Sequence, residues 1–106
     1  MRKPVIVGAA IGAIWAANAE AQEIGDTVEG KAYAERVCAE CHAVLPGQAD
    51  SPKAEATPFE AVAKTPGMTA TALFVHLQTT HQTMPNFVIE SDDRRNIVAY
   101  ILGLKD

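Results

Sequence analysis

The sequence lacks the features that define several common classes of protein. It has no internal repeat, no low-complexity segment and no basic run longer than Arg94–Arg95, which excludes collagen, coiled coils and nucleic-acid binding. No stretch alternates apolar and polar residues as a half-buried strand does. The only two cysteines, Cys38 and Cys41, are too close together to bridge distant segments. A chain of 106 residues forms one small domain, which gains stability from a metal or a large cofactor.

The first 21 residues have the pattern of a secretory signal peptide. A basic start precedes an uncharged apolar stretch from Pro4 to Ala19, and small residues up to Ala21 offer cleavage sites. An uncleaved membrane anchor is the alternative, but the stretch is shorter than the ~20 residues that cross a bilayer. We therefore predict a cleaved signal peptide at residues 1–21, a mature domain at residues 22–106, a periplasmic location and no permanent membrane anchor.

Two helices are predicted in the first half of the mature domain. Asp26, with Glu29 three residues later, resembles a capping box and predicts a helix that runs to about Val37. Thr57 followed by Pro58 predicts a second helix, with the threonine as N-cap and the proline at the first helical position. A Pro-Gly pair ends this second helix after a few residues.

Two further helices are predicted in the second half. Thr69 is expected to cap a helix that reaches residue 79 or 80, and Ser91 is expected to cap the last helix. The segments between helices, residues 43–56 and 81–90, are rich in turn-forming residues and are expected to be loops. The apolar residues expected on the buried faces are Leu73, Phe74 and Leu77 in the third helix, and Ile97, Val98, Tyr100, Ile101 and Leu104 in the fourth.

The pattern C-x-x-C-H is formed by Cys38, Cys41 and His42. In this pattern two thiols add to the vinyl groups of a haem as thioethers, and the attachment directs the adjacent imidazole to the iron. Haem attachment needs an oxidising compartment outside the cytoplasm, and the predicted signal peptide supplies that location independently. We therefore predict one covalently bound haem c, with His42 as the proximal iron ligand.

Two other kinds of site also use closely spaced cysteines. A thioredoxin-type redox pair normally follows a strand in a βαβ unit, and the sequence predicts no strand. A structural zinc site would need a fourth ligand besides Cys38, Cys41 and His42, and the adjacency of Cys41 and His42 makes a cramped tetrahedron. Both alternatives fit the sequence less well than covalent haem does.

The second iron ligand is predicted to be Met84. This residue lies in a loop and is followed by Pro85, which fixes φ and removes a backbone donor, so that the thioether can point at the iron. Ordinary packing is the alternative role of Met84, and His81, three residues away, is a competing ligand. Met68 is expected to fill a gap against a helix, and His76 to lie at the surface or beside a haem propionate.

Together these features resemble class I cytochrome c, and most of all its small soluble bacterial members. The resemblance rests on the C-x-x-C-H motif at the end of the first helix, the Met84–Phe87 loop and a last helix that contains Tyr100. It covers essentially all of the mature chain. Ser51-Pro52 and Thr57-Pro58-Phe59 match two elements that these proteins carry between the haem motif and the methionine loop.

The resemblance implies an all-α fold, in which about four short helices wrap around one covalently bound haem. It implies that Gly30 and Tyr33 in the first helix contact Tyr100 where the first and last helices cross. It also implies that the carbonyl group of a proline accepts the Nδ1 proton of His42, which orients the ring. The candidate prolines are Pro52 and Pro58.

The resemblance implies an electron carrier and not an enzyme. The iron would change between ferrous and ferric while it keeps both ligands, so single electrons pass by outer-sphere transfer between redox protein partners. The net charge of −4 favours partners with basic docking patches, and we expect a monomer. One alternative is the electron-accepting subunit of a periplasmic dehydrogenase complex. Another is an open-site haem sensor or peroxidase, although no distal His-Arg pair flanks Met84.

Overall fold

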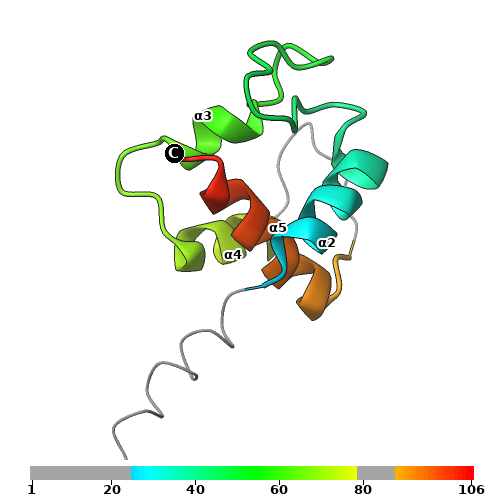
Figure 1. The fold of residues 1–106 in the computed structure, drawn as a ribbon, viewed down its shortest axis with the longest axis vertical. Coiled ribbons are helices and arrows are strands. Elements are labelled where there is room, and N and C mark those ends of the chain that lie inside the picture. The colour runs from blue at the N-terminus through cyan, green and yellow to red at the C-terminus, as the bar shows by residue number, and fades with distance from the viewer. Residues whose placement is uncertain (1–24, 79–87) are drawn as a thin grey trace, which may run out of the picture.

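The computed structural model describes residues 25–78 and 88–106, and these parts are helical and contain no strand (Figure 1). The predicted all-α fold with about four short helices is confirmed. The elements are α2 (Thr27–Tyr33), the π-helix η1 (Ala34–Cys38), α3 (Phe59–Ala63), α4 (Ala70–Gln78) and α5 (Ser91–Gly103). The predicted signal peptide and the predicted ligand Met84 lie outside the described residues.

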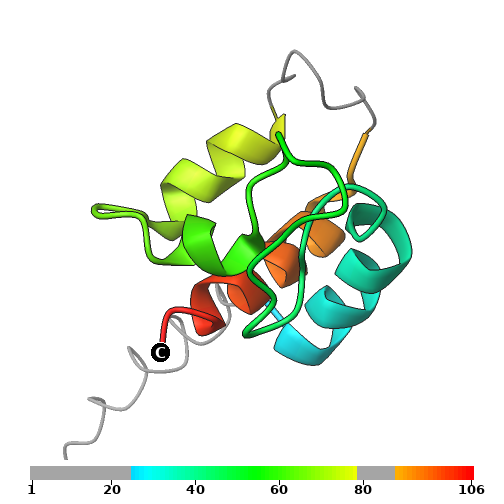
Figure 2. The same cartoon turned by 90° about the horizontal axis from the view of Figure 1, so that it is seen from above.

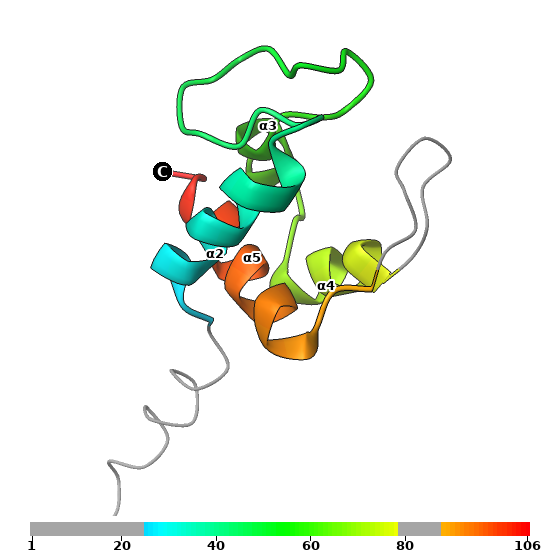
Figure 3. The same ribbon diagram turned by 90° about the vertical axis from the view of Figure 1, so that its right-hand side faces the viewer.

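Helix α5 is the centre of the arrangement, since α2, α3 and α4 all contact it. Seen from above, α2 lies on one side of α5, and α3 and α4 lie on the other (Figure 2). The connection from η1 to α3 arches above α3 (Figure 3). The buried apolar residues include the predicted Leu73, Ile97, Val98, Tyr100, Ile101 and Leu104. Within the described residues no helix is long and apolar enough to cross a membrane.

The start of α2 is capped as predicted, but only in part as a capping box. The Asp26 carboxylate accepts hydrogen bonds from the backbone N–H groups of Val28, at 2.8 Å, and Glu29, at 3.0 Å. In a full capping box the backbone N–H of Asp26 would be bonded to the Glu29 side chain. That N–H is instead donated to Oδ1 of Asn96, at 2.8 Å. The cap therefore also ties α2 to α5.

The predicted crossing of the first and last helices is present at Gly30. A Cβ atom on Gly30 would collide with the backbone carbonyl of Asn96 and would lie 2.9 Å from Cβ of Tyr100. Tyr33 packs against the buried core from the same helix. The glycine therefore allows the two helix backbones to approach more closely than any larger residue would permit.

The predicted N-caps of α3 and α5 are wrong by one residue, whereas that of α4 is confirmed. Thr69 Oγ1 accepts from the N–H of Ala72 at 3.1 Å. Pro58 occupies the N-cap position of α3 and Thr57 does not cap it, because the first helical residue is Phe59. The N-cap of α5 is Glu90, whose carbonyl accepts the N–H of Arg94 at 2.8 Å, so the helix begins at Ser91 itself.

Candidate haem-attachment site

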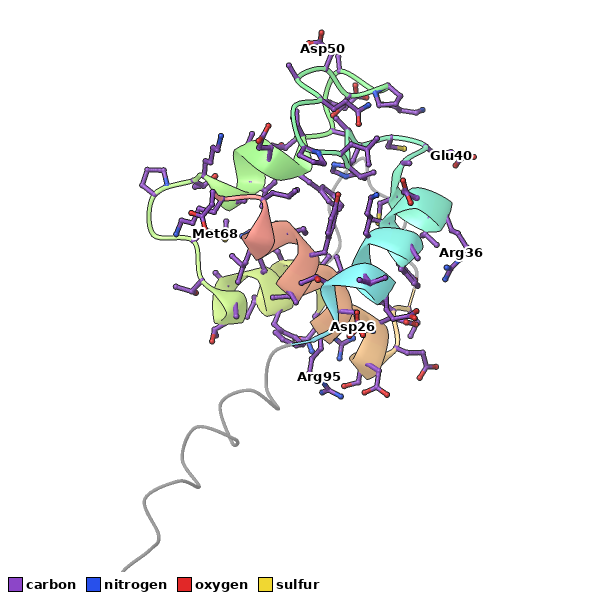
Figure 4. The ribbon with its side chains drawn as sticks, viewed as in Figure 1. Asp26, Arg36, Glu40, Asp50, Met68 and Arg95 are labelled. Carbon is purple, nitrogen blue, oxygen red and sulfur yellow. The ribbon has the colours of Figure 1, made fainter. Side chains whose placement is uncertain are left out.

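The two cysteines stand where the first helix changes its hydrogen-bond pattern. The N–H of Ala39 bonds the carbonyl of Ala34 at 2.9 Å, five residues back, which is the spacing of a π-helix. The carbonyl of Cys38 then accepts the N–H groups of Cys41, at 3.2 Å, and of His42, at 2.9 Å. A compact turn thus carries all three residues of the predicted motif, and Arg36 and Glu40 point outward around it (Figure 4).

Both cysteines are unbridged and partly buried. Burial raises the pKa of the Cys38 thiol to about 11, so the free thiol is protonated at neutral pH. Two reduced thiols on one turn are the groups that thioether formation requires. The redox-dithiol and zinc alternatives gain no support, since the described parts of the chain contain no strand and no cluster of three His, Cys, Asp or Glu side chains suited to a metal ion.

The ring of His42 is oriented by a backbone carbonyl and by an aromatic neighbour. Its Nδ1 lies 2.7 Å from the carbonyl oxygen of Thr57, and because a carbonyl only accepts, Nδ1 carries the proton. The ring of Phe59 lies 5.3 Å from that of His42, centroid to centroid, at an interplanar angle of 49°. With Nδ1 protonated, the lone pair of the imidazole is at Nε2, which is the atom that binds a metal.

The prediction that a proline carbonyl would accept this proton is wrong, because Thr57, the residue before Pro58, provides the acceptor. The proline still has a part in the geometry. A residue that precedes proline is sterically restricted to extended conformations, which limits the directions of its carbonyl group. The Thr57-Pro58 pair was thus the signal in the sequence for the segment that orients His42. The acceptor is the carbonyl of the threonine and not that of the proline. Pro52 is exposed, and the hydroxyl of its neighbour Ser51 accepts a hydrogen bond from the N–H of Ala43.

The chain that follows His42 is fixed by hydrogen bonds to three separate segments. The N–H of Ala43 is donated to Oγ of Ser51 at 2.9 Å, and its carbonyl accepts the N–H of Phe59 at 2.8 Å. The carbonyl of Val44 accepts the hydroxyl proton of Tyr100 at 2.6 Å. Ala43 and Val44 are both buried, so each of these bonds satisfies a polar group that water cannot reach. Sequence reasoning missed this network.

The other residues considered as iron ligands are spread over the fold. Met68 packs against the core beside α3 and α4, as expected for a residue that fills a gap. His76 lies on α4 with an exposed side chain. Met84 and His81 fall in residues 79–87, which the structure does not describe. The structure therefore describes the proximal side of the predicted site.

The described residues fit a covalently attached haem. They provide two free thiols at the required spacing and an adjacent imidazole whose Nδ1 is already engaged. Thr57 would orient the ring of His42 and raise the basicity of Nε2 toward the iron. The two thiols, the imidazole and the carbonyl that orients it thus match the groups expected on the attachment side of a c-type haem.

Comparison with known proteins agrees with this geometry. Residues 25–101 match the family described as cytochrome c oxidase, cbb3-type, subunit III. The chain therefore belongs to the c-type cytochromes, which are typically electron carriers. It is also similar to cytochrome c-552 of Bradyrhizobium diazoefficiens (strain JCM 10833 / BCRC 13528 / IAM 13628 / NBRC 14792 / USDA 110), with 35% identity over 80 residues, which is 76% of each chain. No solved structure matches the chain.

Proposed function

We propose that this protein is a periplasmic monohaem electron carrier, with Cys38 and Cys41 joined to the haem and with His42 and Met84 as iron ligands. The observation that carries the proposal is the bond of 2.7 Å between Nδ1 of His42 and the carbonyl of Thr57. This bond leaves the lone pair of Nε2 available to a metal, and the ring follows directly after the two thiols in the sequence. When bound, haem supplies an iron that changes its charge by one electron.

The residues around His42 contribute rigidity to electron transfer. Thr57 and Phe59 hold the ring from two directions, and the bonds made by Ala43 and Val44 fix the backbone that follows it. A ligand held in this way moves little when the charge of the metal changes. Because little rearrangement accompanies each transfer, the barrier to outer-sphere electron transfer is low. Methionine as the second ligand raises the reduction potential relative to a second histidine.

The charge of the chain supports the choice of partner class. The net charge is −4, and Glu35 and Glu40 are exposed on the turn that carries the cysteines. Arg36 is a nearby cation, but it lies over the ring of Tyr33, with Cζ 5.5 Å from the ring centroid. We propose that the carrier acts as a monomer, exported by the signal at residues 1–21, and docks to redox proteins with basic patches.

The test is an optical spectrum of the matured holoprotein, oxidised and reduced, with carbon monoxide added to the reduced form. We expect the weak long-wavelength band of sulfur-ligated ferric haem and no reaction with carbon monoxide. Met84→Ala should remove the band and admit carbon monoxide. Met68→Ala is the matched control, because this methionine packs against the core, and it should keep the band.

Two results would overturn the assignment. If the wild-type protein lacks the band and binds carbon monoxide at once, the site is open and a sensor or peroxidase function takes its place. If Met68→Ala removes the band while Met84→Ala keeps it, the electron carrier remains but its second ligand is Met68.

A further inference from the structure

Both peptide groups that flank His42 are hydrogen-bonded to one short segment of the connection between η1 and α3. The carbonyl of Cys41, on the N-terminal side of His42, accepts the N–H of Lys53 at 3.1 Å. The N–H of Ala43, on the C-terminal side, is donated to Oγ of Ser51 at 2.9 Å. The main chain of His42 is therefore held on both sides by residues that are only two positions apart.

The serine in this segment is the one partner that contributes a side chain. Because Ser51 precedes Pro52, its backbone is sterically restricted to extended conformations, and this limits where its hydroxyl group can lie. Ser51 is half-buried and Ala43 is fully buried, so water does not readily replace the hydroxyl as acceptor. Without that acceptor the N–H of Ala43 would be a buried donor with no partner, which is unfavourable.

The position of this main chain determines how the ring of His42 meets its own acceptor. Nδ1 of His42 lies 2.7 Å from the carbonyl oxygen of Thr57, and the carbonyl of Ala43 accepts the N–H of Phe59 at 2.8 Å. Residues 42–43 are thus paired with residues 57–59 by two neighbouring bonds. If the peptide group after His42 moves, the distance from Nδ1 to the carbonyl of Thr57 changes with it.

We propose that Ser51 is a positioning residue for His42: its hydroxyl holds the chain after the ring, so that the ring stays bonded to the carbonyl of Thr57. A strong bond at Nδ1 makes Nε2 a better electron donor, which favours ferric iron and limits the reduction potential. This inference rests on the proposed function, since it requires that His42 binds the iron. It does not depend on the identity of the second ligand.

The experiment compares the reduction potential of the matured holoprotein in the wild type and in Ser51→Ala. The bond from Nδ1 to Thr57 is expected to weaken but not to disappear, so the equilibrium constant for reduction should rise about threefold. This is a rise of about 28 mV, at 59 mV per tenfold for one electron. The resonance of the His42 Nδ1 proton in the reduced protein should move upfield, because a longer hydrogen bond deshields the proton less. An unchanged potential together with an unchanged resonance would overturn the proposal.

Thr69→Ala is the matched control, because it removes a bond of the same kind at a different place. Oγ1 of Thr69 accepts the N–H of Ala72 at 3.1 Å at the start of α4. Both variants should lose stability, but only Ser51→Ala should change the potential and the Nδ1 resonance. If Thr69→Ala shifts the potential as far as Ser51→Ala does, the effect follows stability and the proposal is refuted.

A second measurement uses the wild-type holoprotein and does not depend on the folding of a variant. Hydrogen exchange in urea, below the unfolding transition, gives the free energy of opening for each protected proton. The N–H of Ala43 and the Nδ1 proton of His42 should open with the same free energy. A His42 proton that stays protected after Ala43 has opened would show that the ring is held without Ser51, which contradicts the proposal.

The same spectra separate a failure of this inference from a failure of the proposed function. A ring that binds the iron lies above the haem plane, where the haem ring current shifts its proton resonances strongly upfield. If the His42 ring protons of the reduced wild type lack this shift, the proposed function and the role of Ser51 fail together. If they show it and Ser51→Ala matches the wild type in potential and in Nδ1 resonance, only the role of Ser51 fails.

Discussion

The hydroxyl group of Tyr100 donates a hydrogen bond of 2.6 Å to the carbonyl of Val44, 56 positions earlier in the sequence. Val44 is two residues beyond His42, so this bond connects the last helix to the segment that carries the proposed proximal ligand. The same tyrosine contributes its Cβ to the close crossing at Gly30. One side chain therefore sets both the packing of α2 on α5 and the position of the chain beyond His42.

Tyr100→Phe is expected to destabilise the holoprotein by about 1–3 kcal/mol. The ring remains, but the buried carbonyl of Val44 loses its donor. The free energy of unfolding from urea titration gives the measurement. Tyr33→Phe, at a half-buried tyrosine of the neighbouring helix, serves as the control and should have a smaller effect. Equal losses in the two variants would argue against the importance of the Val44 bond.

The pH dependence of stability above pH 10 should also involve Tyr100. Burial, and then the negative charge of Glu35, raise the pKa of Tyr100 above its ordinary value of 10.0. The unfolded chain releases this proton first, so the contribution to stability is complete below pH 10.0 and is lost as the pH rises through the higher pKa of the folded state. The free energy of unfolding, measured from neutral pH to about pH 11, should fall less steeply in Tyr100→Phe than in the wild type.

Gly30→Ala is expected to destabilise the protein by about 3 kcal/mol or more. The added methyl group would meet the backbone carbonyl of Asn96, which cannot rotate away as a side chain can. Gly103→Ala is the matched control, because a Cβ at Gly103 has no neighbour within 4 Å. Thermal unfolding of the two holoproteins should show a large loss for the first variant and almost none for the second.

The chain without haem is expected to be largely unfolded. The double variant Cys38→Ala, Cys41→Ala cannot form thioethers, and the loss of a bound group removes the stability that its binding contributes. Far-UV circular dichroism and the dispersion of a proton NMR spectrum measure the result. Met84→Ala keeps both thioethers and should remain folded. A well-dispersed spectrum from the double variant would contradict the prediction.

Local signals made much of this fold predictable. The cap at Asp26 and the apolar spacing in α5 depend on residues a few positions apart, and both were correctly predicted. The contact between Gly30 and Tyr100 came from resemblance to a family and is present. The C-x-x-C-H motif is equally local, and the family comparison agrees with the interpretation given to it.

Other features depend on segments far apart in the sequence, and these were missed. Asn96 replaces Glu29 as the acceptor for the Asp26 N–H, across 70 positions. Thr57 replaces a proline as the acceptor for His42, because the direction of a carbonyl group depends on how the whole connection folds. No pattern of residue types specifies which backbone oxygen will face a given ring.

The acceptor that orients His42 belongs to the main chain, and this protects it from point mutation. Any residue at position 57 presents a carbonyl oxygen, so the side chain there is free to vary over evolutionary time while the ring of His42 keeps its orientation. A designer who wishes to tune the potential through this bond must reshape the backbone, for example at Pro58, because no side-chain substitution at position 57 deletes the acceptor. The arrangement therefore combines tight control of the His42 ring with tolerance of sequence drift.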